Sequence, residues 1–205
     1  MSENAAMHVA EPATEETPVH VTDANPADPA HDKLFDYARC LLKTMLQMKP
    51  RLHGIQVLTL ANLPEGVMAQ AVNYLRSRLS SEIKMPATDN EAIINFSFTE
   101  AEGSVTKTIF ARHIDDDAAG VQSVATLIIY VGCTANGGRL LIYKDEYSTE
   151  PAAHIDPRPT TRGTVRTVCM PGNVWHVPED IWGWGYRAAF VIQVPRVDPS
   201  ELKKD

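Results

Sequence analysis

Four polar residues in the second half of the chain have the types and the spacing of a combined metal and anion site. His113 and Asp115 are separated by one residue, and His176 and then Arg187 follow further along the chain. Two imidazoles and one carboxylate can bind a divalent transition metal and leave its other coordination positions open. A guanidinium stays charged and makes paired hydrogen bonds to a carboxylate. The four residues therefore predict metal-dependent chemistry that involves an acidic ligand.

A second His-x-Asp triplet, His154 to Asp156, has to be separated from the first. It lies in a proline-rich stretch without periodic pattern, residues 145–163, so we predict that it belongs to a loop outside the metal site. A loop of this length is often a lid or a binding element. For His113 and Asp115, the alternative is a histidine at a strand end that is hydrogen-bonded to a loop acid.

The elements that must position these residues are expected to be short strands. After about residue 90, runs rich in Val, Ile, Thr, Tyr and Phe alternate with Gly, Asn, Asp and Pro. Residues i and i+2 of a strand share a face, so His113 and Asp115 could point to the same place, and antiparallel closure could bring His176 alongside. The expected strands are 92–99, 106–114, 123–131, 139–144, 165–170, 175–177 and 186–194.

Two helices are predicted before these strands. Apolar residues recur at helical spacing from Asp32 until Pro50, and again from Val67 to Leu79 after a short strand at 56–60. Asn62 and Glu65 are placed like a capping box, with Pro64 in the first turn of the second helix. The sequence therefore predicts a mainly β fold with N-terminal helices, α+β in order, in which two helices pack on the sheet of a jelly roll.

The charge distribution separates an N-terminal tail from the body. The net charge of −7 comes from the first 32 residues, which hold seven acidic residues and neither Lys nor Arg. Residues 1–30 are expected to be a disordered acidic tail, and residues 31–205 a single domain. The rest of the chain balances acids and bases, which disfavours nucleic acid as a partner.

The cysteine count and the hydropathy pattern bear on the location of the protein. Three widely spaced cysteines form no CxxC pair, so reduced thiols are expected. We find no apolar run long enough to span a bilayer and no pattern of a secretory signal or mitochondrial presequence. We therefore expect a soluble intracellular protein, located in the cytoplasm, with no membrane partner.

The stretch from His113 to Arg187 resembles the double-stranded β-helix core of the 2-oxoglutarate and Fe(II)-dependent oxygenases. Residues 126–131 (TLIIYV) followed by 137–140 (GGRL) are similar to that family's apolar strand, turn and glycine-pair strand. Residues 171–177 (PGNVWHV) resemble its turn into the strand of the distal histidine. The resemblance covers about 85 residues, from 110 to 194.

The resemblance implies an activity and a role for each site residue. It implies that His113, Asp115 and His176 bind Fe(II) and that Arg187 pairs with the distal carboxylate of 2-oxoglutarate. The enzyme would use 2-oxoglutarate and dioxygen to hydroxylate a substrate, with succinate as the second product. Fold alone does not choose among substrates. Because the body of the chain is electrically neutral and its modest length leaves little room for a separate recognition domain, we expect the substrate to be a peptide side chain or a small molecule.

One position departs from the family pattern. Many members carry Ser or Thr two residues after the arginine as a second donor to the keto acid, where this chain has Ala189. Tyr130 or Thr126 could supply that contact instead. Two other functions remain open: a cupin-like metal enzyme that uses no keto acid, and a non-catalytic jelly roll in which Arg187 recognises an anion. The three tryptophans around His176 could line a substrate pocket or belong to the core.

Overall fold

The largest of the three sheets among the described residues, here called the larger sheet, takes its strands from most of the chain. The computed structural model describes residues 18–48, 54–81, 83, 92–115 and 123–195. Its larger sheet is antiparallel throughout, in the order β1-β8-β4-β11-β3-β2. The strands of this sheet are β1 (His20–Ala24), β2 (Ile55–Thr59), β3 (Ile93–Glu102), β4 (Ser123–Cys133), β8 (Val165–Pro171) and β11 (Trp184–Pro195).

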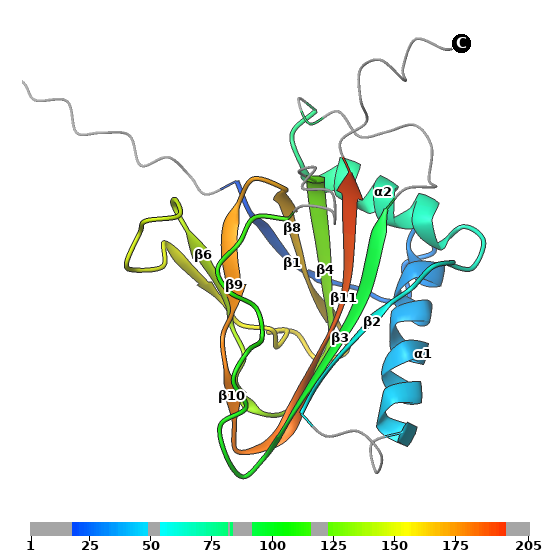
Figure 1. Cartoon of the computed structure of the whole chain (residues 1–205). Helices are drawn as coiled ribbons and strands as arrows, with labels where there is room; N and C mark the ends of the chain where they lie inside the picture. Colours follow the sequence, from blue (N-terminus) through cyan, green and yellow to red (C-terminus); the bar gives the residue numbers. More distant parts are fainter. Residues whose placement is uncertain (1–17, 49–53, 82, 84–91, 116–122, 196–205) are drawn as a thin grey trace, which may run out of the picture.

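A smaller sheet and two helices lie on opposite faces of the larger sheet. The smaller sheet has the order β7-β6-β9, and two further short strands, β5 and β10, pair with each other. Figure 1 shows β6 and β9 facing the larger sheet on one side, while α1 and α2 cover its other side. The bounds of these elements are α1 (Asp32–Met48), α2 (Val67–Arg78), β5 (Asn136–Gly137), β6 (Leu140–Tyr143), β7 (Ala153–Ile155), β9 (Trp175–Pro178) and β10 (Ile181–Trp182).

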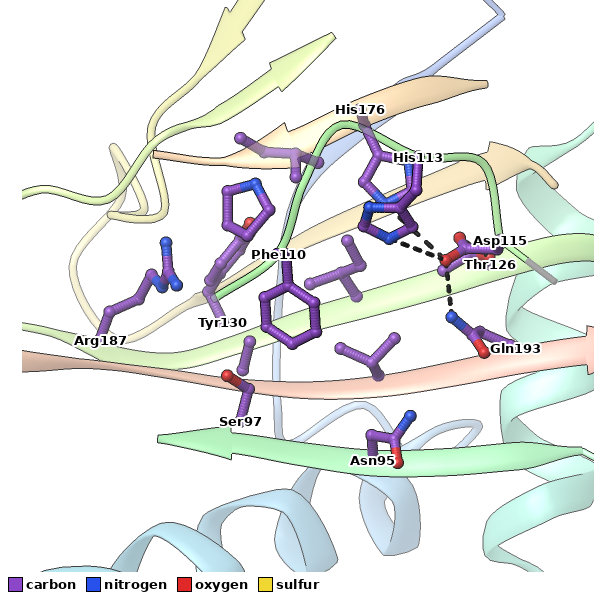
Figure 2. A pocket seen from close by; sticks show the side chains of 15 residues that line it. Asn95, Ser97, Phe110, His113, Asp115, Thr126, Tyr130, His176, Arg187 and Gln193 are labelled. Atoms are coloured by element: carbon purple, nitrogen blue, oxygen red, sulfur yellow. Dashed lines mark hydrogen bonds and ion pairs between the residues drawn. The ribbon is translucent and has the colours of Figure 1, made fainter. Parts of the chain in front are cut away.

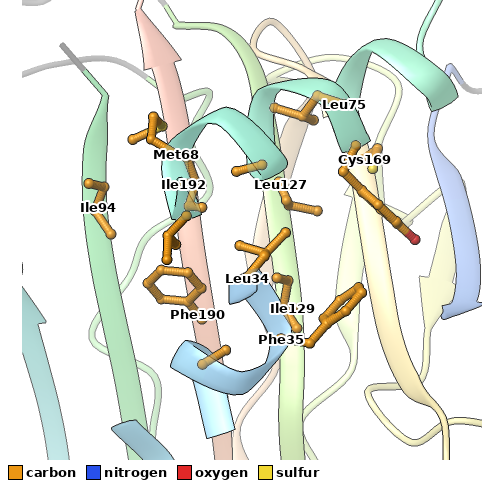
Figure 3. Packing of buried hydrophobic residues seen from close by; sticks show 14 of the residues in the cluster. Leu34, Phe35, Met68, Leu75, Ile94, Leu127, Ile129, Cys169, Phe190 and Ile192 are labelled. Atoms are coloured by element: carbon orange, nitrogen blue, oxygen red, sulfur yellow. The ribbon is translucent and has the colours of Figure 1, made fainter. Parts of the chain in front are cut away.

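The helices pack on the larger sheet because alternate residues of its strands are apolar. Leu127 and Ile129 of β4 and Phe190 and Ile192 of β11 are completely buried beneath the helices (Figure 3). Each such side chain contributes about 1.5–3 kcal/mol of hydrophobic stabilisation. Because successive residues of a strand point to opposite faces, the residues between them point away from the helices and toward the smaller sheet.

The predicted mainly β fold with two N-terminal helices on the sheet is confirmed, but the second helix starts differently. The first helix has the expected limits, whereas α2 begins at Val67, after the residues assigned to a capping box. Gly66 is its N-cap, with φ 82° and no side-chain hydrogen bond. A backbone bond of 3.2 Å from the amide of Val67 to the carbonyl of Pro64 closes the entering turn instead. Neither helix is long and apolar enough to cross a membrane.

The segment that carries the first histidine is not the strand predicted at 106–114. Residues 103–115, here called the ligand segment, make only two single β-bridges, from Thr106 to β10 and from His113 to β9. In Figure 1 this segment runs beside β9, outside both sheets. The strand predicted from the β-branched residues of this segment is wrong, because the segment pairs with neighbouring strands only at isolated points.

The stretch at 145–163 is not wholly a loop. It contains β7, which pairs with β6 and places His154 opposite Leu141. The prediction that His154 belongs to a loop is therefore wrong, although its separation from the first triplet holds. Among the described residues, the one cluster of potential metal ligands does not include His154.

The predicted disordered tail is wrong for part of its length. Residues 20–24 form β1, which pairs antiparallel with β8 at the edge of the larger sheet. The composition of residues 1–30 did not reveal this strand, because its stability comes from β8 and from one acidic residue, Asp23. Residues 1–17 of the predicted tail lie outside the described residues.

Asp23 joins β1 to the body through a partly buried ion pair. Its carboxylate accepts hydrogen bonds from Nε of Arg166 at 2.6 Å and from the amides of Thr160 and Thr161 at 2.8 and 3.2 Å. Burial alone raises the pKa of Asp23, but the hydrogen bonds from Arg166 and Thr160 outweigh it and lower the pKa to about 2. The stabilisation is therefore complete above the ordinary pKa of 3.8 and is lost as the pH falls toward 2.

We expect Asp23→Ala to lower the free energy of unfolding by about 1–3 kcal/mol at pH 7, because charge-assisted hydrogen bonds are lost. The loss should shrink at pH 2.5, where the wild-type carboxyl is partly protonated, and urea titrations at the two pH values measure it. Asp156→Ala is the matched control, because Asp156 is exposed and surface pairs such as Asp156 with Arg158 contribute less than about 1 kcal/mol. An equal loss at both pH values would contradict this role.

Candidate metal centre

The three predicted metal-binding side chains meet in one place between the sheets. Oδ1 of Asp115 lies 3.7 Å from Nε2 of His113 and 3.8 Å from Nε2 of His176. One ligand atom from each of the three residues lies within 4.8 Å of the other two, and the centroids of the imidazole rings are 4.5 Å apart. Figure 2 shows both rings directed toward the carboxylate. Asp115 and His176 are buried, and His113 is half-buried.

Backbone hydrogen bonds bring these distant residues together. His113 and His176 exchange two of them, of 3.0 and 2.9 Å, which join the ligand segment to β9. The amide of Asp115 donates to the carbonyl of Gly172 at 3.2 Å. A Cβ at Gly172 would lie 1.9 Å from the carbonyl oxygen of Ser123, so only glycine lets the backbone of residue 172 lie this close to Ser123.

A backbone carbonyl two residues earlier orients each imidazole. Nδ1 of His113 lies 2.8 Å from the carbonyl of Ala111, and Nδ1 of His176 lies 2.9 Å from that of Val174. A carbonyl oxygen can only accept, so Nδ1 carries the hydrogen and Nε2 keeps a free lone pair. Burial lowers the pKa of His176, which favours the neutral form that a metal ion requires.

Two side chains from the larger sheet hold the Asp115 carboxylate. The hydroxyl of Thr126 donates to Oδ2 at 2.5 Å, and the amide of Gln193 donates to Oδ1 at 2.6 Å. Thr126 lies on β4 and Gln193 on β11, where the two are directly paired in the sheet. The carboxylate is therefore fixed in position by the sheet as well as by the backbone of the ligand segment.

The chemistry of this donor set fits a ferrous ion. Two neutral imidazole nitrogens and one carboxylate oxygen form the facial set that non-haem Fe(II) oxygenases use, with the remaining positions open. Neighbouring ligands on an octahedral ion with bonds of about 2.1 Å are about 3 Å apart. Because the observed separations are 3.7 and 3.8 Å, small side-chain rotations would close the set.

A buried guanidinium lies in the same pocket. Arg187 is 4% exposed, and its Nη1 donates to the carbonyls of Glu179 and Gly138 at 3.0 and 3.5 Å. Within the described part of the chain, no carboxylate lies within 4.0 Å of this guanidinium. Burial lowers the pKa of Arg187, yet a guanidinium stays charged at neutral pH. A buried charge without a counter-ion is costly, so the site favours an anionic ligand.

Tyr130 lies beside this arginine, at the end of the pocket away from the histidines (Figure 2). Burial raises the pKa of Tyr130 to about 12, so its phenol stays neutral and can donate a hydrogen bond. Tyr130 on β4 pairs with Ala189 on β11, the position where a second polar contact was expected. The hydroxyl of Tyr130 is therefore available next to Ala189, the position where many members of the family carry Ser or Thr. Thr126, the other predicted contact, lies at the metal end instead and bonds Asp115.

One pocket contains all of these groups. It has an empty volume of about 610 Å³, part of which is open to solvent. Its lining comes from the ligand segment, the smaller sheet and the inner face of the larger sheet. The lining residues not named above for the metal or anion contacts are Asn95, Ser97, Phe110, Ile128, Leu140, Pro178 and Val191.

Comparison with solved structures finds a similar fold in several enzymes. A prolyl hydroxylase from Trichoplax adhaerens, in complex with a hypoxia inducible factor peptide fragment, has a TM-score of 0.54 and 15% identity, over 93% of this chain and 89% of that one. An oxidoreductase of the 2OG-Fe(II) oxygenase family from Burkholderia pseudomallei has a TM-score of 0.52 and 16% identity, over 88% and 85%. The chain has the fold of the 2-oxoglutarate and Fe(II)-dependent oxygenases.

A third structure with this oxygenase fold is a prolyl-4-hydroxylase from Pseudomonas putida. Its TM-score is 0.51 at 14% identity, over 89% of this chain and 95% of that one. No family model matches the sequence, and no curated protein matches it. The predicted resemblance is therefore confirmed at the level of the fold, and the roles of individual residues stay predictions.

Sequence reasoning missed Gln193 and misjudged the tryptophans. Gln193 follows Arg187 at an even spacing on one strand, so the alternation of strand residues could have placed both on the same face. Trp182 and Trp184 are 41% and 77% exposed. No tryptophan of the described residues lines the pocket with the metal-binding side chains. We therefore assign the tryptophans no part in this pocket.

Proposed function

We propose that this protein is an Fe(II)- and 2-oxoglutarate-dependent dioxygenase that hydroxylates a protein side chain or a small molecule. One observation carries the proposal. A 2-His-1-carboxylate donor set and a buried arginine without a carboxylate partner line the same pocket. A metal site alone would also suit a cupin-like enzyme, and an arginine alone would suit an anion-binding module. The combination suits a co-substrate with a metal-chelating end and a distal carboxylate.

In this proposal each group has a separate task. His113, Asp115 and His176 hold Fe(II), and Arg187 and Tyr130 bind the distal carboxylate of 2-oxoglutarate. When bound, the metal supplies the dioxygen chemistry that oxidises the keto acid and the substrate. The chain itself orients the reactants, because both ends of the co-substrate meet groups fixed by backbone hydrogen bonds.

The pocket lining supports an uncharged substrate group. Apart from Arg187, Asp115 and the two histidines, the described residues that line it are apolar or neutral and polar. A lining of this kind suits a peptide side chain or a neutral small molecule better than a nucleic acid phosphate. The Trichoplax adhaerens structure, which holds a peptide fragment, adds support for a peptide.

The test is keto-acid turnover by the purified full-length protein. We expect succinate to form from 2-oxoglutarate in the presence of Fe(II) and dioxygen, and to form faster when a pool of peptides or metabolites contains the substrate. Omission of Fe(II) is the control for each pool. Bound metal without succinate formation would instead support the cupin-like enzyme, and a protein that binds no metal would support the binding module.

A further inference from the structure

We propose that Thr126 and Gln193 form a two-point clamp that fixes the orientation of the Asp115 carboxylate and thereby raises its affinity for the metal. This inference rests on the proposed function and goes beyond it. Asp115 is 2% exposed and Thr126 is completely buried, so water does not compete freely for these hydrogen bonds. Both residues of the clamp come from one cross-strand pair of β4 and β11, which is a rigid part of the larger sheet.

The two hydrogen bonds hold the two oxygens of the carboxylate separately. Oδ1 faces the Nε2 atoms of both histidines, at 3.7 and 3.8 Å, and accepts the Gln193 amide at 2.6 Å. Oδ2 accepts the Thr126 hydroxyl at 2.5 Å. Because each oxygen has its own donor on the sheet, the carboxylate is held against rotation about its Cβ–Cγ bond.

Gln193 must present its NH₂ group to the carboxylate, because a carboxylate only accepts hydrogen bonds. With either donor removed, a single hydrogen bond from the larger sheet would remain to orient the carboxylate.

The orientation of the carboxylate matters because partners that hydrogen-bond a ligand fix its direction toward the metal and tune its strength as a ligand. A carboxylate that is already held in place also loses less side-chain freedom when the metal binds.

The experiment measures the Kd of the metal-free protein for Mn(II), a stable substitute for Fe(II), by titration followed by electron paramagnetic resonance. We expect Thr126→Val and Gln193→Met each to raise this Kd by about 10- to 100-fold, the usual effect of losing a partner of a metal ligand. The absorption spectrum of bound Co(II) should also change in both variants, because it reports the coordination geometry.

Thr167→Val is the matched control. Thr167 is completely buried on β8, and its hydroxyl bonds Tyr74 and the carbonyl of Thr22, on the helix side of the sheet. We expect this variant to lower Tm, as Thr126→Val does, but to leave the Kd for Mn(II) and the Co(II) spectrum unchanged. A merely structural role of Thr126 predicts the same behaviour for both variants.

Unchanged Kd values and Co(II) spectra in both Thr126→Val and Gln193→Met would overturn the clamp. The proposed function would stand in that case if the wild type binds Mn(II) and forms succinate from 2-oxoglutarate. A wild type that binds no Mn(II) would overturn the clamp and the proposed function together. The two failures are therefore distinguishable in one set of samples.

Discussion

His113→Ala is expected to lose metal binding while keeping its fold. The substitution removes one of three protein ligands, each worth about 3 kcal/mol in a site of this kind, so the Kd should rise by about 100-fold or more. The side chain of His113 is 35% exposed and belongs to the ligand segment, outside both sheets, so Tm should change little. Metal content of the purified protein and Mn(II) titration measure the first effect, and thermal unfolding measures the second.

His154→Ala is the control for this prediction, since it tests the second His-x-Asp triplet. His154 is exposed on β7, and among the described residues it belongs to no cluster of potential metal ligands. We expect its substitution to leave the metal content at the wild-type level. Retention of stoichiometric metal by His113→Ala, or its loss in His154→Ala, would show that the site has been assigned to the wrong triplet.

The sequence was enough to predict the layers of the fold. Alternating apolar residues in β4 and β11 and the helical spacing in α1 are local patterns, and each reports directly which face of an element is buried. The arginine could be placed in a buried strand for the same reason, because its neighbours Ala188 and Phe190 are apolar. Ala188 and Phe190 are 0% exposed in the structure.

The parts that could not be predicted depend on contacts between distant residues. Residues 106–114 have strand composition, yet the ligand segment pairs with β10 and β9 only at two single bridges. Strand β1 lies in a stretch with the composition of a disordered tail, and Asp23 ties it to residues 137 or more positions away. The role of Thr126 was also hidden, because its partner Asp115 is fixed by the backbone of Gly172. Local pattern carries no information on such partners.

Arg187→Met should separate the effect of the arginine on the stability of the ligand-free protein from its effect on the affinity for 2-oxoglutarate. Loss of the charge-assisted hydrogen bonds to the distal carboxylate should weaken 2-oxoglutarate binding by about 2–5 kcal/mol, which raises its Kd by about 30-fold or more. In the ligand-free protein, however, the same change removes a buried charge that has no carboxylate partner within the described chain. Replacing such a charge by an apolar side chain of similar size is often neutral or stabilising, so we expect Tm to be equal or higher.

Arg166→Met is the control for Arg187→Met, because it should change the stability and leave the binding of 2-oxoglutarate unchanged. Arg166 is 11% exposed and donates to Asp23 at 2.6 Å, so its loss leaves a partly buried carboxylate without its cation. We expect a lower Tm with little change in the Kd for 2-oxoglutarate. Isothermal titration with 2-oxoglutarate in the presence of Mn(II) and thermal unfolding without ligand measure both quantities. A large fall in Tm for Arg187→Met with unaltered binding would mean that the arginine stabilises the fold and does not recognise the keto acid.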